Sequence, residues 1–450
     1  MQALSFESIG RYIMGQPIRF EGGISSVSID SRTVLPGGLF VALEGENADG
    51  HDYVNAAFER GAAAALCQRE IKDAQGRIIY VADTVKALGD IARGYLADHR
   101  PQTVMGITGS VGKTSTKDFM ASVLSTRCKT LKTKGNYNNH IGLPLSVFEL
   151  EDHEAAVFEM GMSGFGEISY LTSIVKPDIA VITNIGVSHA ENLGSREGIL
   201  KAKSEIFEGL APGGFALLNA DDGYLPKLAG TTGAGEIFFG IDSPLAKIRA
   251  EITSEEGGYV AFSCSVNGQT IELEAFGRHN IYNMLPAVAV GGLLKIPAED
   301  IKRGIEACES ADMRLQIFTS HGIVFIKDCY NASPDSMRAA FDILAKMDAG
   351  SCRKLAVLGG MRELGAYSDE EHRKIGALAC SVCDRLLAVG ESSELYLEGA
   401  ASPKAAAFEG HEAAAKELAD CLAPGDIVLF KASRAARLER VIDLVLEERK

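Results

Sequence analysis

Short apolar runs alternate with segments of helical periodicity along most of the chain. Runs such as TVMGIT (103–108), AAVFEM (155–160) and IAVITNI (179–185) have the length of buried strands. Between residues 101 and about 310 this alternation predicts a parallel sheet covered by helices on both faces. The pattern recurs after Met313 in GIVFIKD, KLAVLGG, RLLAVG and DIVLFKAS. We therefore predict an α/β protein.

The same pattern predicts three domains, at residues 1–100, 101–312 and 313–450. The first contains strand-like SVSID and GGLFVAL, helical HDYVNAAFERGA and apolar AAAALC, and a predicted linker at residues 99–101 ends it. Residues 246–276 interrupt the central alternation with strand-like sequence and a two-residue hairpin turn at Asn267-Gly268, so we expect an antiparallel appendage there. Ser333-Pro334 predicts a helix N-cap followed by proline at the first helical position.

Composition narrows the classes of function. The chain has 45 Lys and Arg against 60 Asp and Glu, a net charge of −15, which argues against a nucleic-acid groove or an anionic membrane surface. No apolar run approaches the roughly 20 residues of a membrane span, and the first residues do not resemble a signal peptide. Nine cysteines, an odd number in a long chain, favour a reducing compartment. We expect a soluble cytoplasmic protein that binds neither nucleic acid nor membrane.

The segment GITGSVGKTST (106–116) lies between a predicted strand and the predicted helix TSTKDFMASVLST. Gly109 and Gly112 would free the backbone so that its N–H groups point at phosphate oxygens, Lys113 would supply a positive charge, and Thr114 a hydroxyl for Mg²⁺. Ile107 stands where the common loop GxxxxGK[ST] has its first glycine, which weakens the assignment to the usual P-loop NTPases. A glycine-rich turn is the alternative, but the strand, loop and helix context favours a phosphate site.

Two further residues follow neighbouring strands of the predicted sheet. Glu159 lies near the end of AAVFEM, and His189 lies just beyond IAVITNI. Ligands collect beyond the carboxyl ends of parallel strands, so a carboxylate and an imidazole would flank the phosphate loop. Glu159 is a candidate metal ligand, with a helix-capping or surface acid as the alternative. A hydrogen-bonded loop residue is the alternative for His189.

The predicted helix SREGILKAKSEIFEGL (195–210) carries a lysine on its apolar face. Lys203 lies four residues after Ile199 and three before Ile206, whereas Lys201 points toward solvent. Lys203 either extends to the edge of the apolar surface or is held there for a function that tolerates the loss of its charge. The periodicity leaves both interpretations open.

These motifs together resemble the Mur ligases, ATP-dependent amide-forming enzymes of peptidoglycan precursor synthesis. The resemblance covers essentially the whole chain and rests on DSRTVLPGGLFVALEGENADGHDYV, TGSVGKTST, GNYNNHIGLPLSVFEL, FEMGMSGFGEI, TNIGVSH, KAKSEIF, GRHNIYN, KDCYNASPDSM, GGMRELG and LFKASR. The family's own phosphate loop is TGxxGK[ST], without the first glycine. Within the family, DCYNASPDSMRAA and GMRELG are similar to the ligase that adds D-alanyl-D-alanine.

The resemblance implies a role for each candidate residue. The phosphate-binding residues would be Thr108, Gly109, Ser110, Val111, Gly112, Lys113 and Thr114. The residues that contact adenosine and phosphates would be Asn280, Asn283, Arg314 and Asp328. Thr114 and Glu159 would hold one Mg²⁺ and His189 a second, and Lys203 would be carbamylated and approach the second ion. The UDP-sugar would contact Asp30, Ser31 and Arg32.

The resemblance also implies the reaction. ATP would activate the terminal carboxylate of UDP-N-acetylmuramoyl-tripeptide as an acyl phosphate, and the amine of D-Ala-D-Ala would displace the phosphate; Lys113, Glu159, His189 and Lys203 would be the catalytic residues. A monomer is expected. The alternatives are a nucleotide-dependent switch and another carboxylate–amine ligase of the superfamily, such as a folylpolyglutamate synthase, although the domain that contains DSRTVLPGGLF argues against the latter.

Overall fold

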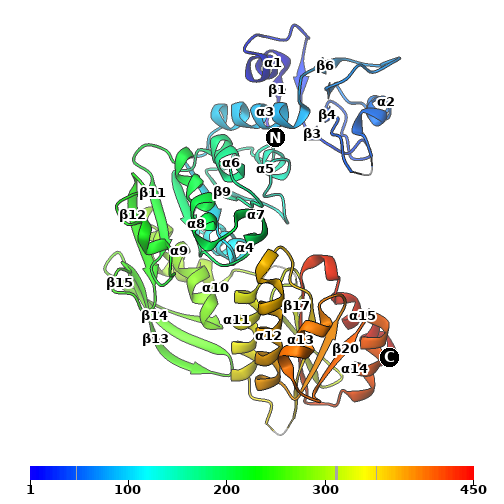
Figure 1. The fold of residues 1–450 in the computed structure, drawn as a ribbon. Coiled ribbons are helices and arrows are strands. Elements are labelled where there is room, and N and C mark those ends of the chain that lie inside the picture. The colour runs from blue at the N-terminus through cyan, green and yellow to red at the C-terminus, as the bar shows by residue number, and fades with distance from the viewer. Residues whose placement is uncertain (47, 310–312, 351, 450) are drawn as a thin grey trace.

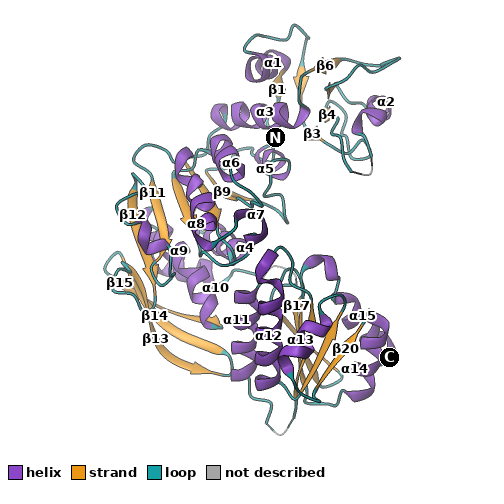
Figure 2. Ribbon diagram, in the orientation of Figure 1, coloured by secondary structure: helices purple, strands orange, loops and turns teal. Residues whose placement is uncertain are grey.

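The computed structural model describes residues 1–46, 48–309, 313–350 and 352–449, which form three units along an extended molecule (Figure 1, Figure 2). Each unit has its own β-sheet with helices, which confirms the predicted α/β class. Residue 312, the predicted end of the central domain, lies outside the described residues, and the predicted domain boundaries stay predictions. Among the described helices, none is long and apolar enough to cross a membrane.

The described part of the N-terminal unit has a four-stranded sheet, a two-stranded sheet and three α-helices. Its parallel strands lie in the order β3 (Val27–Ser28), β4 (Leu39–Val41), β5 (Ala64–Cys67) and β6 (Ile78–Tyr80), and β1 (Leu4–Ser5) pairs with β2 (Gly23–Ile24). The helices are α1 (Phe6–Met14), α2 (Val54–Glu59), which follows a 3-10 turn at Gly50–Tyr53, and α3 (Thr84–Asp98). Ser5 caps α1 through its side chain, and Gly15 ends the helix in a left-handed conformation.

Helix α3 joins the N-terminal unit to the central unit. The buried cluster that contains Tyr95 includes residues of both units, and the Tyr95 hydroxyl donates to the carbonyl of Leu150 at 2.7 Å. After the helix, Arg100 pairs with Asp178 at 3.0 Å. Residues 99–101, predicted as a linker, therefore anchor the N-terminal unit to the central sheet.

The central unit contains a nine-stranded sheet in the order β15-β14-β13-β12-β11-β10-β7-β9-β8. Its parallel strands are β7 (Thr103–Thr108), β8 (Thr130–Lys132), β9 (Ala155–Glu159), β10 (Ile179–Ile182), β11 (Phe215–Asn219) and β12 (Gly235–Gly240). Because β9 and β10 lie on opposite sides of β7, the strand order reverses there. The loops that follow these three strands flank one crevice, the usual ligand position in such sheets.

Helices cover both faces of this sheet, as predicted. Successive residues of each buried strand point to opposite faces of the sheet and so enter different hydrophobic cores. Val104 lies in the core formed with α5 (Gly142–Val147), α6 (Glu167–Val175) and α8 (Arg196–Ser204). Met105 lies in the core formed with α4 (Lys113–Ser125), α9 (Arg278–Leu293) and α10 (Ala298–Glu306). The short helix α7 (Ala190–Leu193) and a 3-10 turn at Leu225–Leu228 complete the unit.

The antiparallel strands β13 (Ile248–Glu256), β14 (Tyr259–Val266) and β15 (Gln269–Phe276) follow β12. The predicted turn is confirmed, since Asn267 (φ 52°) and Gly268 (φ 77°) both adopt the left-handed conformation that a two-residue hairpin needs. The predicted antiparallel strands are confirmed, and because β13 also pairs with β12 they extend the central sheet at its edge.

The C-terminal unit is a six-stranded sheet in the order β16-β17-β21-β18-β19-β20. Its strands are β16 (Gln316–Ser320), which is antiparallel, and β17 (Ile323–Asp328), β18 (Lys354–Gly359), β19 (Arg385–Val389), β20 (Ala405–Phe408) and β21 (Ile427–Lys431). Its helices are α11 (Pro334–Lys346), α12 (Ser368–Val382), α13 (Ser393–Ala400), α14 (His411–Cys421) and α15 (Glu439–Glu448), with 3-10 turns at Gly365–Tyr367 and Arg434–Ala436. Helix α11 begins as predicted, with Ser333 as its N-cap and Pro334 as its first residue.

The helix predicted over residues 195–210 is shorter in the structure. Helix α8 ends at Ser204 and a 3-10 turn, Glu205–Gly209, follows it. The Glu205 carboxylate accepts the backbone N–H of Gly166 at 2.9 Å and of Ser169 at 3.1 Å, at the start of α6. These tertiary contacts fix the last turn in a tighter conformation than periodicity predicts.

Replacement of Tyr95 by phenylalanine should destabilise the junction between the N-terminal and central units. The Tyr95 hydroxyl also accepts the backbone N–H of Gln2 at 2.8 Å, so the change leaves two backbone groups without a partner. We expect a loss of about 1–3 kcal/mol in the free energy of unfolding, measured by urea denaturation. Tyr80→Phe is the control, because this exposed side chain makes no hydrogen bond among the described residues, and an equal loss in both variants would contradict the account.

Candidate active site

The phosphate loop connects β7 to α4 and needs glycine at two positions. A Cβ on Gly109 (φ 151°) would lie 1.9 Å from Thr183 Oγ1, and one on Gly112 (φ 82°) would lie 2.3 Å from Asn283 Oδ1. These contacts leave no room for a side chain, and the positive φ angles favour glycine independently. The predicted succession of strand, loop and helix is confirmed, so the first N–H groups of α4 face the crevice.

Lys113 folds back over this loop. Its Nζ donates to the carbonyl of Gly109 at 2.7 Å and to that of Ser110 at 3.4 Å. Burial lowers the pKa of the Lys113 ammonium, and the charge of Glu159 opposes that shift. The amine is therefore held where it can exchange loop carbonyls for phosphate oxygens.

Glu159 at the end of β9 is a buried carboxylate that is held by hydrogen bonds. Its side chain accepts from Thr114 Oγ1 at 2.9 Å and from Asn138 Nδ2 at 2.8 Å, and Arg314 donates to the same Thr114 hydroxyl at 3.0 Å. Within the described residues it forms no ion pair with a lysine or arginine. A buried carboxylate beside a hydroxyl is a set of hard oxygen ligands that suits Mg²⁺.

A cavity of about 740 Å³ extends from the phosphate loop between the central and C-terminal units. The predicted nucleotide residues Asn280, Asn283, Arg314 and Asp328 all line it. Asn283 accepts from Thr116 at 3.4 Å and donates to Asn280 at 2.9 Å, which ties α9 to α4. The Arg314 guanidinium stacks 4.2 Å from the Tyr330 ring centroid. Both units are therefore needed to form this cavity.

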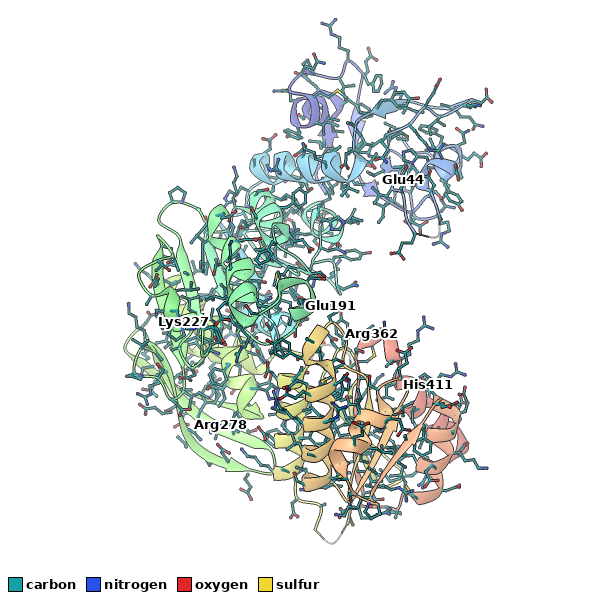
Figure 3. All side chains as sticks on the ribbon, in the orientation of Figure 1. Glu44, Glu191, Lys227, Arg278, Arg362 and His411 are labelled. Atoms are coloured by element: carbon teal, nitrogen blue, oxygen red, sulfur yellow. The ribbon has the colours of Figure 1, made fainter. Side chains whose placement is uncertain are left out.

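His189 lies at a second contact between the units. Its Nδ1 is 2.7 Å from the Glu363 carboxylate, and this contact lowers the pKa of the Glu363 carboxyl. Glu191 and Arg362 lie on opposite sides of the same boundary (Figure 3). A Cβ on Gly365 would lie 2.8 Å from the Glu191 Cα, so the backbones of the 3-10 turn and of α7 pack closely against each other. His189 is placed beside the phosphate loop by its strand but does not line the cavity itself.

Lys203 is buried, with 1% of its surface exposed, so it does not extend to solvent. It makes neither a hydrogen bond nor an ion pair through its side chain to any part of the chain that the structure describes. Burial, followed by the charge of Lys113, lowers its pKa well below the usual range. Burial therefore favours the neutral amine over the ammonium ion.

The predicted UDP-sugar residues lie in the N-terminal unit, away from the cavity. Arg32 pairs with Asp30 at 2.8 Å, and this contact lowers the pKa of the Asp30 carboxyl to about 2. Ser31 between them is buried. The structure therefore brings the phosphate and nucleotide residues together but keeps Asp30, Ser31 and Arg32 apart from them.

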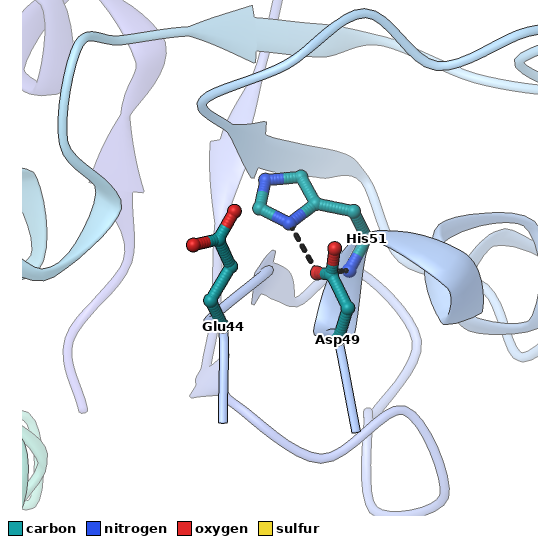
Figure 4. Close-up of side chains that lie close together, drawn as sticks. All are labelled: Glu44, Asp49 and His51. Carbon is teal, nitrogen blue, oxygen red and sulfur yellow. Dashed lines mark hydrogen bonds and ion pairs between the residues drawn. The ribbon is translucent and has the colours of Figure 1, made fainter. Parts of the chain in front are cut away.

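Glu44, Asp49 and His51 form a compact cluster in the N-terminal unit (Figure 4). His51 Nε2 accepts the backbone N–H of Gln68 at 3.0 Å, so Nδ1 carries the proton and donates to Asp49 at 2.6 Å. The second Asp49 oxygen accepts from Arg69 at 2.9 Å. Because no imidazole lone pair remains for a metal, the cluster holds the loop conformation.

Sequence reasoning missed several residues of the cavity. Asn138 lies in GNYNNHIGLPLSVFEL, a motif of the family resemblance from which no role for this side chain follows. Tyr330, Lys431 and Asp335 line the cavity from the C-terminal unit. Lys431 donates to Asp328, and both are buried. Tyr330, Asp335 and Lys431 each lie more than two hundred residues after the phosphate loop in the sequence. Only the tertiary arrangement of the two units shows that they share its cavity.

Comparison with protein families gives three consecutive matches. The Mur ligase family catalytic domain matches residues 23–96, the Mur ligase middle domain residues 107–291, and the Mur ligase glutamate ligase domain residues 313–434. The UDP-N-acetylmuramoyl-tripeptide--D-alanyl-D-alanine ligase of Bacillus subtilis (strain 168) is 38% identical over 94% of this chain and 93% of its own length.

Solved structures agree with these matches. MurF from Acinetobacter baumannii superposes with a TM-score of 0.91 at 32% identity and 99% coverage of both chains. MurF ligase from Thermotoga maritima in complex with ADP has a TM-score of 0.83 at 30% identity, covering 94% of this chain and 98% of its own.

Lys113→Ala should leave the fold intact and lower ATP turnover on the order of 10²-fold or more, because the removed charge stabilises phosphate oxygens in the transition state. ADP release measures the effect. Lys129→Ala, a partly exposed lysine after the same helix that pairs with Asp152, should be nearly silent. Near wild-type turnover in Lys113→Ala would overturn the assignment of the phosphate loop.

Proposed function

Because the chain belongs to the Mur ligase family, we propose that it joins D-alanyl-D-alanine to UDP-N-acetylmuramoyl-tripeptide with ATP and so makes the pentapeptide precursor of peptidoglycan. The observation that carries this proposal is similarity over nearly the full length to ligases with this activity, at 38% and 33% identity for those of Bacillus subtilis and Escherichia coli. The cavity between two units of one chain supports it.

The chemistry explains why the site needs a phosphate loop. A carboxylate does not form an amide with an amine in water until one of its oxygens becomes a good leaving group. Transfer of the γ-phosphoryl group of ATP to the tripeptide carboxylate makes an acyl phosphate, and attack by the amine then releases inorganic phosphate. Lys113 and the Arg314 guanidinium are the cations that would neutralise charge on the transferred phosphoryl group.

Thr114 and Glu159 fit one Mg²⁺, because their oxygens meet at 2.9 Å and the carboxylate has no cationic partner among the described side chains. For a second ion we propose His189 and Lys203. The neutral form of an amine is the form that reacts with CO2, and burial favours this form of Lys203. The resulting carbamate would offer hard oxygen ligands to Mg²⁺. When bound, Mg²⁺ would reduce the charge on the phosphate oxygens.

Residues of both units would hold the rest of ATP. We assign Thr108 to Thr114 to the phosphates and Asn280, Asn283, Arg314 and Asp328 to the nucleoside and phosphates, since these line the cavity or its loop. The ADP complex of the Thermotoga maritima ligase supports a nucleotide in this fold.

The nucleotide-sugar end of the second substrate would lie on the N-terminal unit, at Asp30, Ser31 and Arg32. The substrate would then reach from that unit to the phosphate loop, which agrees with domains at 1–100, 101–312 and 313–450. We propose a monomer, because one chain supplies every side chain of the cavity described above. A cytoplasmic location is part of the proposal and is supported by nine unpaired cysteines.

The proposed function is tested by ADP release and product mass with defined substrates. Release of ADP should require both the UDP-tripeptide and D-Ala-D-Ala, and the product mass should equal the sum of the two less one water. A nucleotide-dependent switch would instead release ADP without either peptide, and a different ligase of the superfamily would ignore D-Ala-D-Ala.

Lys203→Ala should lose most activity and keep its fold, because the carbamate would be absent. Acetate should partly restore activity, since it can occupy the vacated space and supply oxygens to the metal. In the unaltered protein, ¹³CO2 should give a carbamate signal in carbon NMR that Lys203→Ala lacks.

Lys201→Ala is the matched control on the same helix. Its Nζ is exposed and lies 5.7 Å from the Phe165 ring centroid, so activity and the carbamate signal should both persist. Full activity in Lys203→Ala, or a carbamate signal that survives it, would contradict the proposed second metal site.

A further inference from the structure

Asp335 of the C-terminal unit lies against Gly186 of the central unit, which in turn contacts Ser110 of the phosphate loop. Its Oδ2 is 2.5 Å from the position that a Cβ on Gly186 would take, and the Ser110 Cβ is 3.2 Å from that same point. Gly186 in turn donates its N–H to Ser110 Oγ at 2.9 Å. The absence of a side chain at Gly186 therefore makes room for a carboxylate beside the phosphate loop, and Asp335 lines the cavity.

The other acids that the C-terminal unit presents here already have partners. Glu363 contacts His189 at 2.7 Å, and Asp328 accepts from Lys431. Among the described residues, the only ion-pair partner of Asp335 is Arg338, one helical turn further on, at 3.3 Å. Arg338 is shared, because it also donates to Glu371 on α12. Asp335 is therefore the described acid of this group that is most available to a substrate.

The surroundings of Asp335 make its ionised form less favourable than that of an aspartate in water, although 46% of the side-chain surface is exposed. Desolvation in the crevice raises the pKa of the carboxyl, and the charges of Arg338 and Arg196 oppose that shift, while Glu371 and Asp222 reinforce it. A carboxylate with a raised pKa accepts a proton more readily than an ordinary aspartate does.

Position in the helix does not explain this arrangement. Asp335 lies in the first turn of α11, where an acid stabilises the helix. That benefit does not require the side chain to face the phosphate loop. Beside the phosphate loop, the negative charge of Asp335 repels the phosphates of ATP. The same charge attracts the amine substrate, which is an ammonium ion at neutral pH.

We propose that Asp335 binds the ammonium group of the incoming dipeptide and accepts its proton. The inference rests on the proposed function, because it concerns the second half of that reaction.

The step balances as follows. One N–H bond of the ammonium breaks and its proton moves to Asp335 Oδ2, which leaves the nitrogen lone pair free. The lone pair forms the C–N bond at the acyl carbon, and the bond from that carbon to the phosphate oxygen breaks with its electron pair. The nitrogen's surplus proton leaves with the phosphate, which departs as hydrogen phosphate, and Asp335 returns its own proton to water.

The test compares two nucleophiles in Asp335→Asn. Hydroxylamine is neutral at neutral pH and traps an acyl phosphate as a hydroxamate without help from a base. Ligation of D-Ala-D-Ala should fall on the order of 10²-fold or more in kcat, while hydroxamate formation stays within a few-fold of wild type. The deficit should shrink as the pH rises past roughly 8, where the dipeptide amine loses its proton in solution.

Two variants complete the design. Asp335→Glu should recover part of the ligation rate, and Asp342→Asn, an exposed acid on the same helix, should behave as wild type. Equal losses of ligation and hydroxamate, or full ligation by Asp335→Asn, would overturn the inference. If the wild-type protein makes hydroxamate but does not ligate D-Ala-D-Ala to the UDP-tripeptide, the proposed function is wrong and the inference fails with it.

Discussion

A buried carboxylate held only by hydrogen bonds organises the site. Glu159 ends β9 next to the strand that carries the phosphate loop, and Thr114 and Asn138 each donate to one of its oxygens. Burial of such a charge without an ion-pair partner among the described residues is costly, and the charge of Lys113 nearby offsets part of that cost. Arg314 reaches the same threonine from the C-terminal unit, which ties nucleotide chemistry to the contact between units.

The two junctions between units are built differently. The N-terminal and central units share a hydrophobic core around Tyr95 of α3. The central and C-terminal units meet at the site largely through polar contacts, to which the packing of Val187 against the C-terminal core adds an apolar one. A shared apolar core fixes one substrate-binding unit relative to the phosphate loop. Polar contacts that water can replace suit a boundary at which substrates enter and products leave. The C-terminal unit contributes Arg314, Asp328 and Asp335 to the cavity from that side.

Local patterns were sufficient for much of the fold. The period of apolar residues predicted the parallel strands, and Asn267-Gly268 predicted its hairpin, because both depend on neighbouring residues alone. Tertiary contacts decided the rest: pairing of β13 with β12 made the hairpin part of the central sheet, and Glu205 tightened the end of the 195–210 segment. In the site, Lys113, Thr114 and Glu159 were predictable from strand ends. Asn138 and Asp335 were not, because their roles arise from folding distant segments onto the phosphate loop.

The account claims above all that the phosphate loop activates a carboxylate by transferring a phosphoryl group to it. The most direct measurement labels the terminal carboxylate of the UDP-tripeptide with ¹⁸O and follows the label by mass spectrometry through ligation to D-Ala-D-Ala. Each amide bond formed should place a labelled oxygen in the inorganic phosphate released. Amide formation with unlabelled phosphate, or phosphate release with the label retained in unchanged tripeptide, would contradict the account.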